Sequence, residues 1–74
     1  MTGALNCLVT GAGGFIGRHL TCRLVQDGHN VRTLVRSATD HPETKEFVGD
    51  IRDAELVKAA VEDADVVFHL SSLN

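Results

Sequence analysis

Glycine is concentrated in one short segment of the chain, residues 10–17, which read Thr-Gly-Ala-Gly-Gly-Phe-Ile-Gly. An apolar run precedes the segment and an amphipathic stretch follows it, so the glycines lie in a turn between a strand and a helix. Gly11 allows a tight reversal out of the strand, Gly14 leaves the backbone open to a pyrophosphate, and Gly17 lets the helix pack closely on the strand. The N–H groups and the positive dipole end at the helix start then face a bound anion. The segment, Gly13 included, therefore predicts a dinucleotide-binding turn.

Two related phosphate-binding patterns do not fit this segment. A Gly-x-Gly-x-x-Gly pattern that starts at Gly11 fails, because its last position is Ile16. A Walker loop fails as well, because no Lys-Ser or Lys-Thr pair follows the glycines. The glycines fit the spacing Gly-x-x-Gly-x-x-Gly instead. The alternative is a glycine-rich turn that binds nothing.

The end of the next expected strand bears on the choice of cofactor. A carboxylate about 20 residues past the glycine turn binds the ribose hydroxyls of NAD, whereas an arginine there accommodates the 2′-phosphate of NADP. Arg36 stands at this distance, and no carboxylate occurs between Asn30 and Thr39. A guanidinium group is a planar fork that suits phosphate. The sequence therefore favours NADP over NAD, and the alternative is a solvated arginine at a strand end.

The elements that must position these residues follow from hydrophobic periodicity and turn signals. Ile16, Leu20 and Leu24 form the apolar stripe of a first helix that Gly28 ends, and Asp53 is the expected N-cap of a second helix. The core-facing stripe of this second helix is Leu56, Val57, Ala60 and Val61. We expect strands at 5–10, 30–36, 45–48 and 65–70, the first and last of them buried, helices at 15–27 and 53–63, and a polar loop at 37–44. Helices between strands imply an α/β fold with a parallel sheet.

Composition narrows the class of protein. The chain has 74 residues, 43% of them hydrophobic, and a net charge of −3, with no basic patch of the kind that binds nucleic acid. No apolar run approaches the roughly 20 residues that span a membrane, and no signal peptide is visible. Cys7 and Cys22 lie in segments that we expect to be buried, as reduced thiols. These features favour a cytoplasmic globular protein.

Other chemistry-bearing residues do not form a recognisable site. The four histidines lack a metal-ligand spacing, and packing or solvation explains them better than metal binding; they are His19, His29, His41 and His69. Ser71 and Ser72 lack the Gly-x-Ser-x-Gly pattern of a nucleophile elbow. We therefore expect no metal and no catalytic residue in this chain.

The glycine segment resembles the signature of the extended short-chain dehydrogenase/reductase family, which includes nucleotide-sugar epimerases, dehydratases and 3β-hydroxysteroid dehydrogenase-like enzymes. Residues 49–53, Gly-Asp-Ile-Arg-Asp, resemble the family's segment after the third strand. Residues 66–72, Val-Val-Phe-His-Leu-Ser-Ser, resemble its fourth strand, which two alanines usually follow. Here two serines replace the alanines, and a backbone contact to the cofactor remains plausible.

The resemblance implies a role for several further residues. Phe15 and Ile16 would contact the pyrophosphate through their amides, and Asp50 and Ile51 would border the adenine. The residues that would line the rest of the cofactor groove are Leu70, Ser71 and Ser72. The fold implied is a Rossmann-type parallel sheet of four strands in the order 3-2-1-4 with flanking helices, the fourth strand being a bare edge.

The resemblance also identifies what the chain lacks. The family's chemistry uses a Tyr-x-x-x-Lys pair, in which the phenol exchanges a proton with the substrate, and this chain contains no tyrosine. We therefore expect residues 1–74 to be the N-terminal half of an NAD(P)-binding domain, weakly stable alone, with the substrate site elsewhere. Three hypotheses stay open: the N-terminal part of a dehydrogenase, reductase or epimerase; a non-catalytic NADP-sensing module; and a Rossmann remnant without a ligand. The substrate and the oligomeric state do not follow from the sequence.

Overall fold

The elements of the fold follow the expected order closely. A computed structural model describes residues 3–39 and 43–70, and this part of the chain forms four strands and two helices. In chain order they are β1 (Asn6–Thr10), α1 (Phe15–Gln26), β2 (Asn30–Val35), β3 (Lys45–Val48), α2 (Ala54–Val61) and β4 (Val66–His69). Each lies within two residues of its predicted bounds.

The four strands form one parallel sheet in the order β3-β2-β1-β4, which confirms the predicted topology. The chain leaves β1 toward β2 on one side, whereas β4 pairs with β1 on the other side. The direction of the crossover connections therefore reverses at β1. In open α/β sheets, ligands bind beyond the carboxyl ends of the strands at this switch point.

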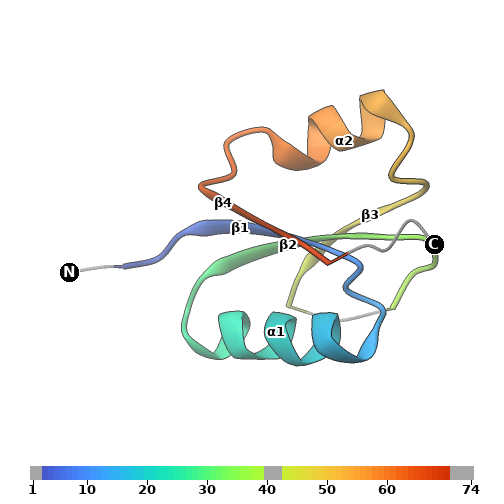
Figure 1. Ribbon diagram of the computed structural model, residues 1–74. Helices are drawn as coiled ribbons and strands as arrows, with labels where there is room; N and C mark the ends of the chain where they lie inside the picture. The colour runs from blue at the N-terminus through green and yellow to red at the C-terminus, as the bar shows by residue number, and fades with distance from the viewer. Residues whose placement is uncertain (1–2, 40–42, 71–74) are drawn as a thin grey trace.

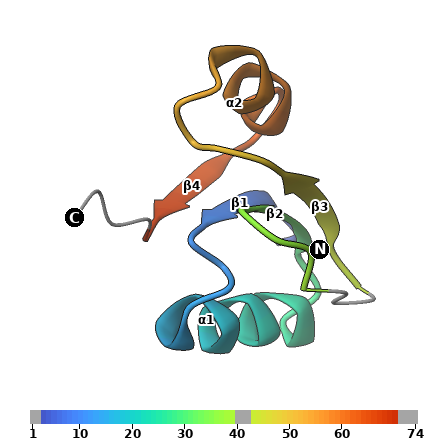
Figure 2. The same ribbon diagram turned by 90° about the vertical axis from the view of Figure 1, so that its right-hand side faces the viewer.

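The two helices cover opposite faces of the sheet (Figures 1 and 2). Side chains alternate along β1, so Cys7 and Val9 pack in the core on the α1 side, whereas Leu8 packs in the core on the α2 side. The α1 side of the core also contains Ala12, Leu24, Val31 and Val35, and the α2 side contains Leu34 and Ala60. The central strand is thus buried on both faces, as its apolar run predicts.

The buried face of α1 differs from the predicted stripe. Gly17, Thr21 and Leu24 are buried, whereas Ile16 is 69% exposed. The helix contacts the preceding turn at Gly17, and this contact turns Ile16 toward the solvent. Cys22 is exposed on the same helix, so the expectation that both cysteines are buried was wrong for this one.

The fourth strand is less buried than its apolar sequence predicts. Val67 is 47% exposed, and β4 pairs only with β1 among the described strands. The expectation of a buried strand was therefore wrong, whereas the expected bare edge is confirmed. On α2, Val61 is 37% exposed rather than part of the core, because it lies at the last turn of a short helix.

The predicted helix ends are confirmed. Gly28, with φ 87°, follows α1, and its N–H donates to the Val25 carbonyl. The Asp53 carboxylate accepts the backbone N–H groups of Glu55 and Leu56 at 3.1 and 3.2 Å. Among the described residues, no helix combines the length and apolar character needed to cross a membrane.

The cap at Asp53 gives a first testable prediction. Asp53→Ala removes the acceptor for two amides at the start of α2, so we expect a loss of about 1 kcal/mol in the free energy of unfolding. Urea denaturation followed by circular dichroism measures this loss. Asp53→Asn keeps an acceptor oxygen and is the matched control. An alanine variant as stable as the asparagine variant would contradict the capping role.

Candidate functional site

The glycine turn begins at the carboxyl end of β1, beside the switch point. Gly11 has φ 73°, a left-handed conformation that favours glycine. Its N–H donates to the Leu34 carbonyl of β2 at 3.2 Å, and its own carbonyl accepts the Gly14 N–H at 3.1 Å. The turn is thus tied to the neighbouring strand and closes directly into α1.

Gly17 is the point at which α1 touches this turn. A Cβ built on Gly17 would lie 2.3 Å from the Gly11 carbonyl oxygen and 2.8 Å from the Ala12 Cα. Both neighbours are backbone atoms, so no rotation of a side chain could make room. The predicted close packing of helix on turn is confirmed, and it sets the position of the helix start.

The start of α1 offers its amides without a side chain to cap them. Gly14 is the N-cap, and within the described residues no side chain hydrogen-bonds to the helix start. The first turn also contains no acidic residue. Uncapped N–H groups and the positive end of the helix dipole form an environment that stabilises an anion.

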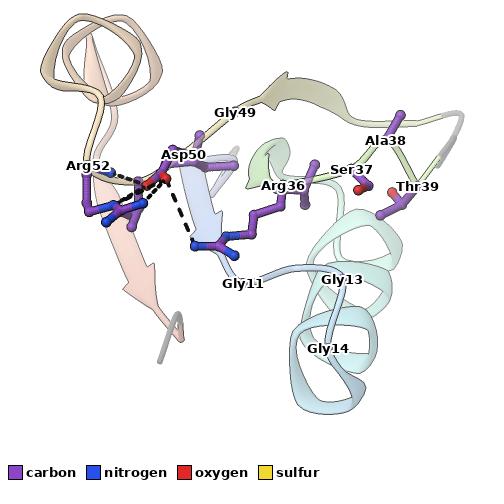
Figure 3. A pocket seen from close by; sticks show the side chains of 13 residues that line it. Gly11, Gly13, Gly14, Arg36, Ser37, Ala38, Thr39, Gly49, Asp50 and Arg52 are labelled. Atoms are coloured by element: carbon purple, nitrogen blue, oxygen red, sulfur yellow. Dashed lines mark hydrogen bonds and ion pairs between the residues drawn. The ribbon is translucent and has the colours of Figure 1, made fainter. Parts of the chain in front are cut away.

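A groove of about 690 Å³ opens beside the turn (Figure 3). Three segments form it: the glycine turn, the end of β2 with the residues after it, and the loop between β3 and α2. The lining residues are Gly11, Gly13, Gly14, Leu34, Val35, Arg36, Ser37, Ala38, Thr39, Gly49, Asp50, Ile51 and Arg52. A Cβ built on Gly13 would lie 3.9 Å from the Thr39 Cγ2, so the groove is narrow at this point.

The structure brings half of the predicted site residues together in this groove, namely Gly11, Gly13, Gly14, Arg36, Asp50 and Ile51. The other described ones lie next to it without lining it. Phe15, Ile16 and Gly17 form the first turn of α1, and Leu70 follows β4. Ser71 and Ser72 lie outside the described residues.

Leu70 is connected to the glycine turn through Thr10. Its N–H donates to the Thr10 carbonyl at 3.2 Å and to the Thr10 hydroxyl at 3.1 Å. The same hydroxyl lies 2.8 Å from Nδ1 of His69, the residue opposite Thr10 in the strand register. These contacts hold the ends of β1 and β4 together at the switch point.

Three lining residues, Ser37, Thr39 and Arg52, were not singled out from the sequence. Ser37 and Thr39 follow Arg36 directly, and the Thr39 N–H donates to the Glu46 carboxylate at 3.1 Å. Arg52 lies two residues after Asp50. Proximity in sequence to predicted site residues is the signal that could have found them.

An acidic side chain lies between two arginines at the edge of the groove (Figure 3). The Asp50 carboxylate accepts hydrogen bonds from Arg52 Nη2 at 2.7 Å and from Arg52 Nε at 3.1 Å. It also accepts the Arg52 backbone N–H at 2.8 Å. The Arg36 Nη2 lies 4.0 Å from the same carboxylate. The side-chain and backbone hydrogen bonds from Arg52 hold the pKa of Asp50 well below its usual range, and the same pair raises the pKa of Arg52.

The arrangement suits the binding of a phosphorylated ligand. It combines the amides of a helix start, a narrow groove beyond the carboxyl ends of the strands, and guanidinium groups. The sequence matches the model of the NAD dependent epimerase/dehydratase family over residues 7–74. The chain belongs to this family.

Individual relatives agree with this assignment. The chain is 39% identical over 69 residues to a 3 beta-hydroxysteroid dehydrogenase/Delta 5→4-isomerase of Mycobacterium tuberculosis, a match that covers 89% of this chain and 19% of the relative. The fold is similar to that of a short-chain dehydrogenase/reductase superfamily protein of Agrobacterium tumefaciens with bound NAD. That match has a TM-score of 0.86 and 28% identity, and covers 93% of this chain and 21% of the other.

A second solved structure, uronate dehydrogenase of the same bacterium, is 31% identical with a TM-score of 0.82, over 99% of this chain and 28% of that one. The fold is therefore the Rossmann type predicted from the sequence. The chain spans about a fifth of the length of the curated relatives it matches.

Proposed function

We propose that this chain binds the ADP-ribose part of NAD(P) as the N-terminal half of the cofactor-binding domain of an oxidoreductase or epimerase. The observation that carries the proposal is the groove itself. It places the glycine turn, Arg36 and the Asp50–Ile51 segment around one space, at the carboxyl ends of β1, β2 and β3. The same family includes a structure with bound NAD.

Each part of the ligand has a matching part of the groove. The amides at the start of α1, those of Phe15 and Ile16, would hold the pyrophosphate, because no side chain among the described residues caps them. Gly13 and Gly14 leave room for the phosphates beside the turn. The loop of Asp50 and Ile51 would border the adenine at the other end of the groove.

Arg36 would recognise the 2′-phosphate, so the preferred cofactor is NADP. Its side chain is 78% exposed and lines the groove at the end of β2, where the ribose of a dinucleotide lies in this fold. The residues after it, Ser37 to Thr39, line the same wall and contain no carboxylate that would favour NAD.

The bound cofactor would supply the hydride for a redox step, and the residues of this chain would bind and orient it. The proton-transfer residues and the substrate site would lie in the rest of a longer protein, since the matched relatives extend well beyond the aligned segment. The absence of tyrosine from these 74 residues also fits a second candidate, a non-catalytic NADP-sensing module. A Tyr-x-x-x-Lys pair in the longer protein would decide for the enzyme.

Calorimetric titration of the chain with ADP-ribose and with 2′-phospho-ADP-ribose tests the proposal. The two ligands differ only in the 2′-phosphate, and neither requires the nicotinamide half of a site. We expect both to bind, and the phosphorylated ligand to bind about tenfold or more tightly, because a charge-assisted hydrogen bond contributes roughly 1.5–3 kcal/mol.

Two outcomes would contradict parts of the proposal. No binding of either ligand, by a chain whose circular dichroism spectrum shows it folded, would mean that the glycine turn has only a structural role. Equal Kd values for the two ligands would leave the ADP-ribose site standing and would remove the preference for NADP.

A further inference from the structure

The two arginines at the edge of the groove do not share Asp50 equally. Arg52 approaches the carboxylate with two guanidinium nitrogens, Nη2 at 2.7 Å and Nε at 3.1 Å. Arg36 approaches it with one, at 4.0 Å, the outer limit of an ion pair. Figure 3 shows Asp50 between the two side chains, with Arg36 extending from the β2 side.

This asymmetry matters because Asp50 has one negative charge for two cations. A carboxylate that is already paired in bidentate fashion attracts a second guanidinium less than a free one does. The low pKa of Asp50 has its largest cause in Arg52, which agrees with the distances. Arg36 thus keeps most of its hydrogen-bonding capacity for a ligand in the groove.

We propose that Arg52 determines selectivity for a 2′-phosphate indirectly, by pairing with Asp50 and so leaving Arg36 available to the phosphate. The proposal rests on the function proposed above, in which Arg36 meets that phosphate. Arg52 is a positioning residue in this scheme, since it acts through Asp50.

The backbone makes the consequence of removing the Arg52 side chain specific. The N–H of residue 52 donates to Asp50 Oδ1 at 2.8 Å, and this bond survives any substitution at position 52 other than proline. In Arg52→Ala the carboxylate therefore stays in place while it loses its main cation. Arg36 becomes its partner, and a 2′-phosphate then has to compete with Asp50 for Arg36.

The test measures the selectivity ratio, the Kd of ADP-ribose divided by the Kd of 2′-phospho-ADP-ribose, on the full chain. The adenine and pyrophosphate contacts are common to both ligands, so a general loosening of the site changes both Kd values and leaves the ratio unchanged. We expect Arg52→Ala to lower the ratio about fivefold, the effect of one exposed charge pair at about 4 Å. Arg23→Ala is the matched control, because it removes an exposed arginine that pairs with Asp27 on α1 outside the groove.

A second background separates this proposal from direct contact between Arg52 and the phosphate. Asp50→Asn removes the competing charge, so we expect it to raise the ratio. In that background, Arg52→Ala should change the ratio by less than about twofold, since no carboxylate remains to capture Arg36. An equal loss in both backgrounds would overturn the proposal in favour of a direct contact, and an unchanged ratio in Arg52→Ala would overturn it outright.

Arg36→Ala distinguishes the failure of this inference from the failure of the proposed function. If Arg36→Ala abolishes selectivity while Arg52→Ala leaves it intact, the inference is wrong and the NADP preference stands. If Arg36→Ala also leaves the ratio unchanged, the preference assigned to Arg36 is wrong, and the role of Arg52 is rejected with it.

Discussion

Gly17→Ala is expected to destabilise the chain by ~3 kcal/mol or more, the upper range for adding a methyl group to a packed site. The added Cβ would lie 2.3 Å from the Gly11 carbonyl oxygen. Both Gly11 and Ala12 approach with backbone atoms, so the start of α1 has to move away from the turn. A small domain has only about 5–15 kcal/mol of stability in total, which makes this a large share. Urea denaturation followed by circular dichroism measures the loss.

The same turn provides matched controls. A Cβ on Gly13 would meet only the Thr39 Cγ2 at 3.9 Å, and one on Gly14 only the Gly11 carbonyl oxygen at 3.5 Å. Both are ordinary contacts, and Gly14 has an ordinary φ of −81°. We therefore expect Gly13→Ala and Gly14→Ala to unfold near the wild-type midpoint. Gly17→Ala as stable as these two would show that the helix start does not pack on the turn as described.

The order of the elements could be predicted from the sequence because each depends on local signals. The apolar run before Gly11, the cap at Asp53 and the stop at Gly28 act within a few residues of their own positions. The buried face of α1 could not, because it depends on a contact between Gly17 and the turn before it. A stripe of Ile16, Leu20 and Leu24 is equally periodic, yet Ile16 is exposed.

The candidate site shows the same division. Gly11, Gly14 and Arg36 belong to patterns with a known spacing along the chain, and the structure places all three around one groove. Arg52 belongs to no such pattern. Its place depends on the backbone after Asp50, where the N–H and the guanidinium of residue 52 contact the same carboxylate. Such a pairing becomes visible only once the loop is folded.

The second large effect is expected from Arg36→Asp, which should reverse the selectivity ratio for the 2′-phosphate. The variant replaces the cation at the end of β2 by a carboxylate, the group that binds the ribose hydroxyls of NAD in this fold. Loss of a charge-assisted hydrogen bond worth roughly 1.5–3 kcal/mol lowers affinity for 2′-phospho-ADP-ribose about 10- to 100-fold, and repulsion between carboxylate and phosphate adds to it. ADP-ribose should bind at least as well as it does to the wild type. Calorimetric titration with both ligands measures the two changes separately.

Arg36→Lys is the control that separates charge from geometry. A lysine keeps the positive charge but lacks the planar fork that meets a phosphate with two N–H groups, so its ratio should fall between those of the wild type and Arg36→Asp. A lysine variant as selective as the wild type would mean that charge alone attracts the phosphate. An aspartate variant that loses affinity for both ligands equally would place Arg36 outside the recognition of the 2′-phosphate. The side chain would then be a solvated arginine whose 4.0 Å contact with Asp50 helps to hold the groove together.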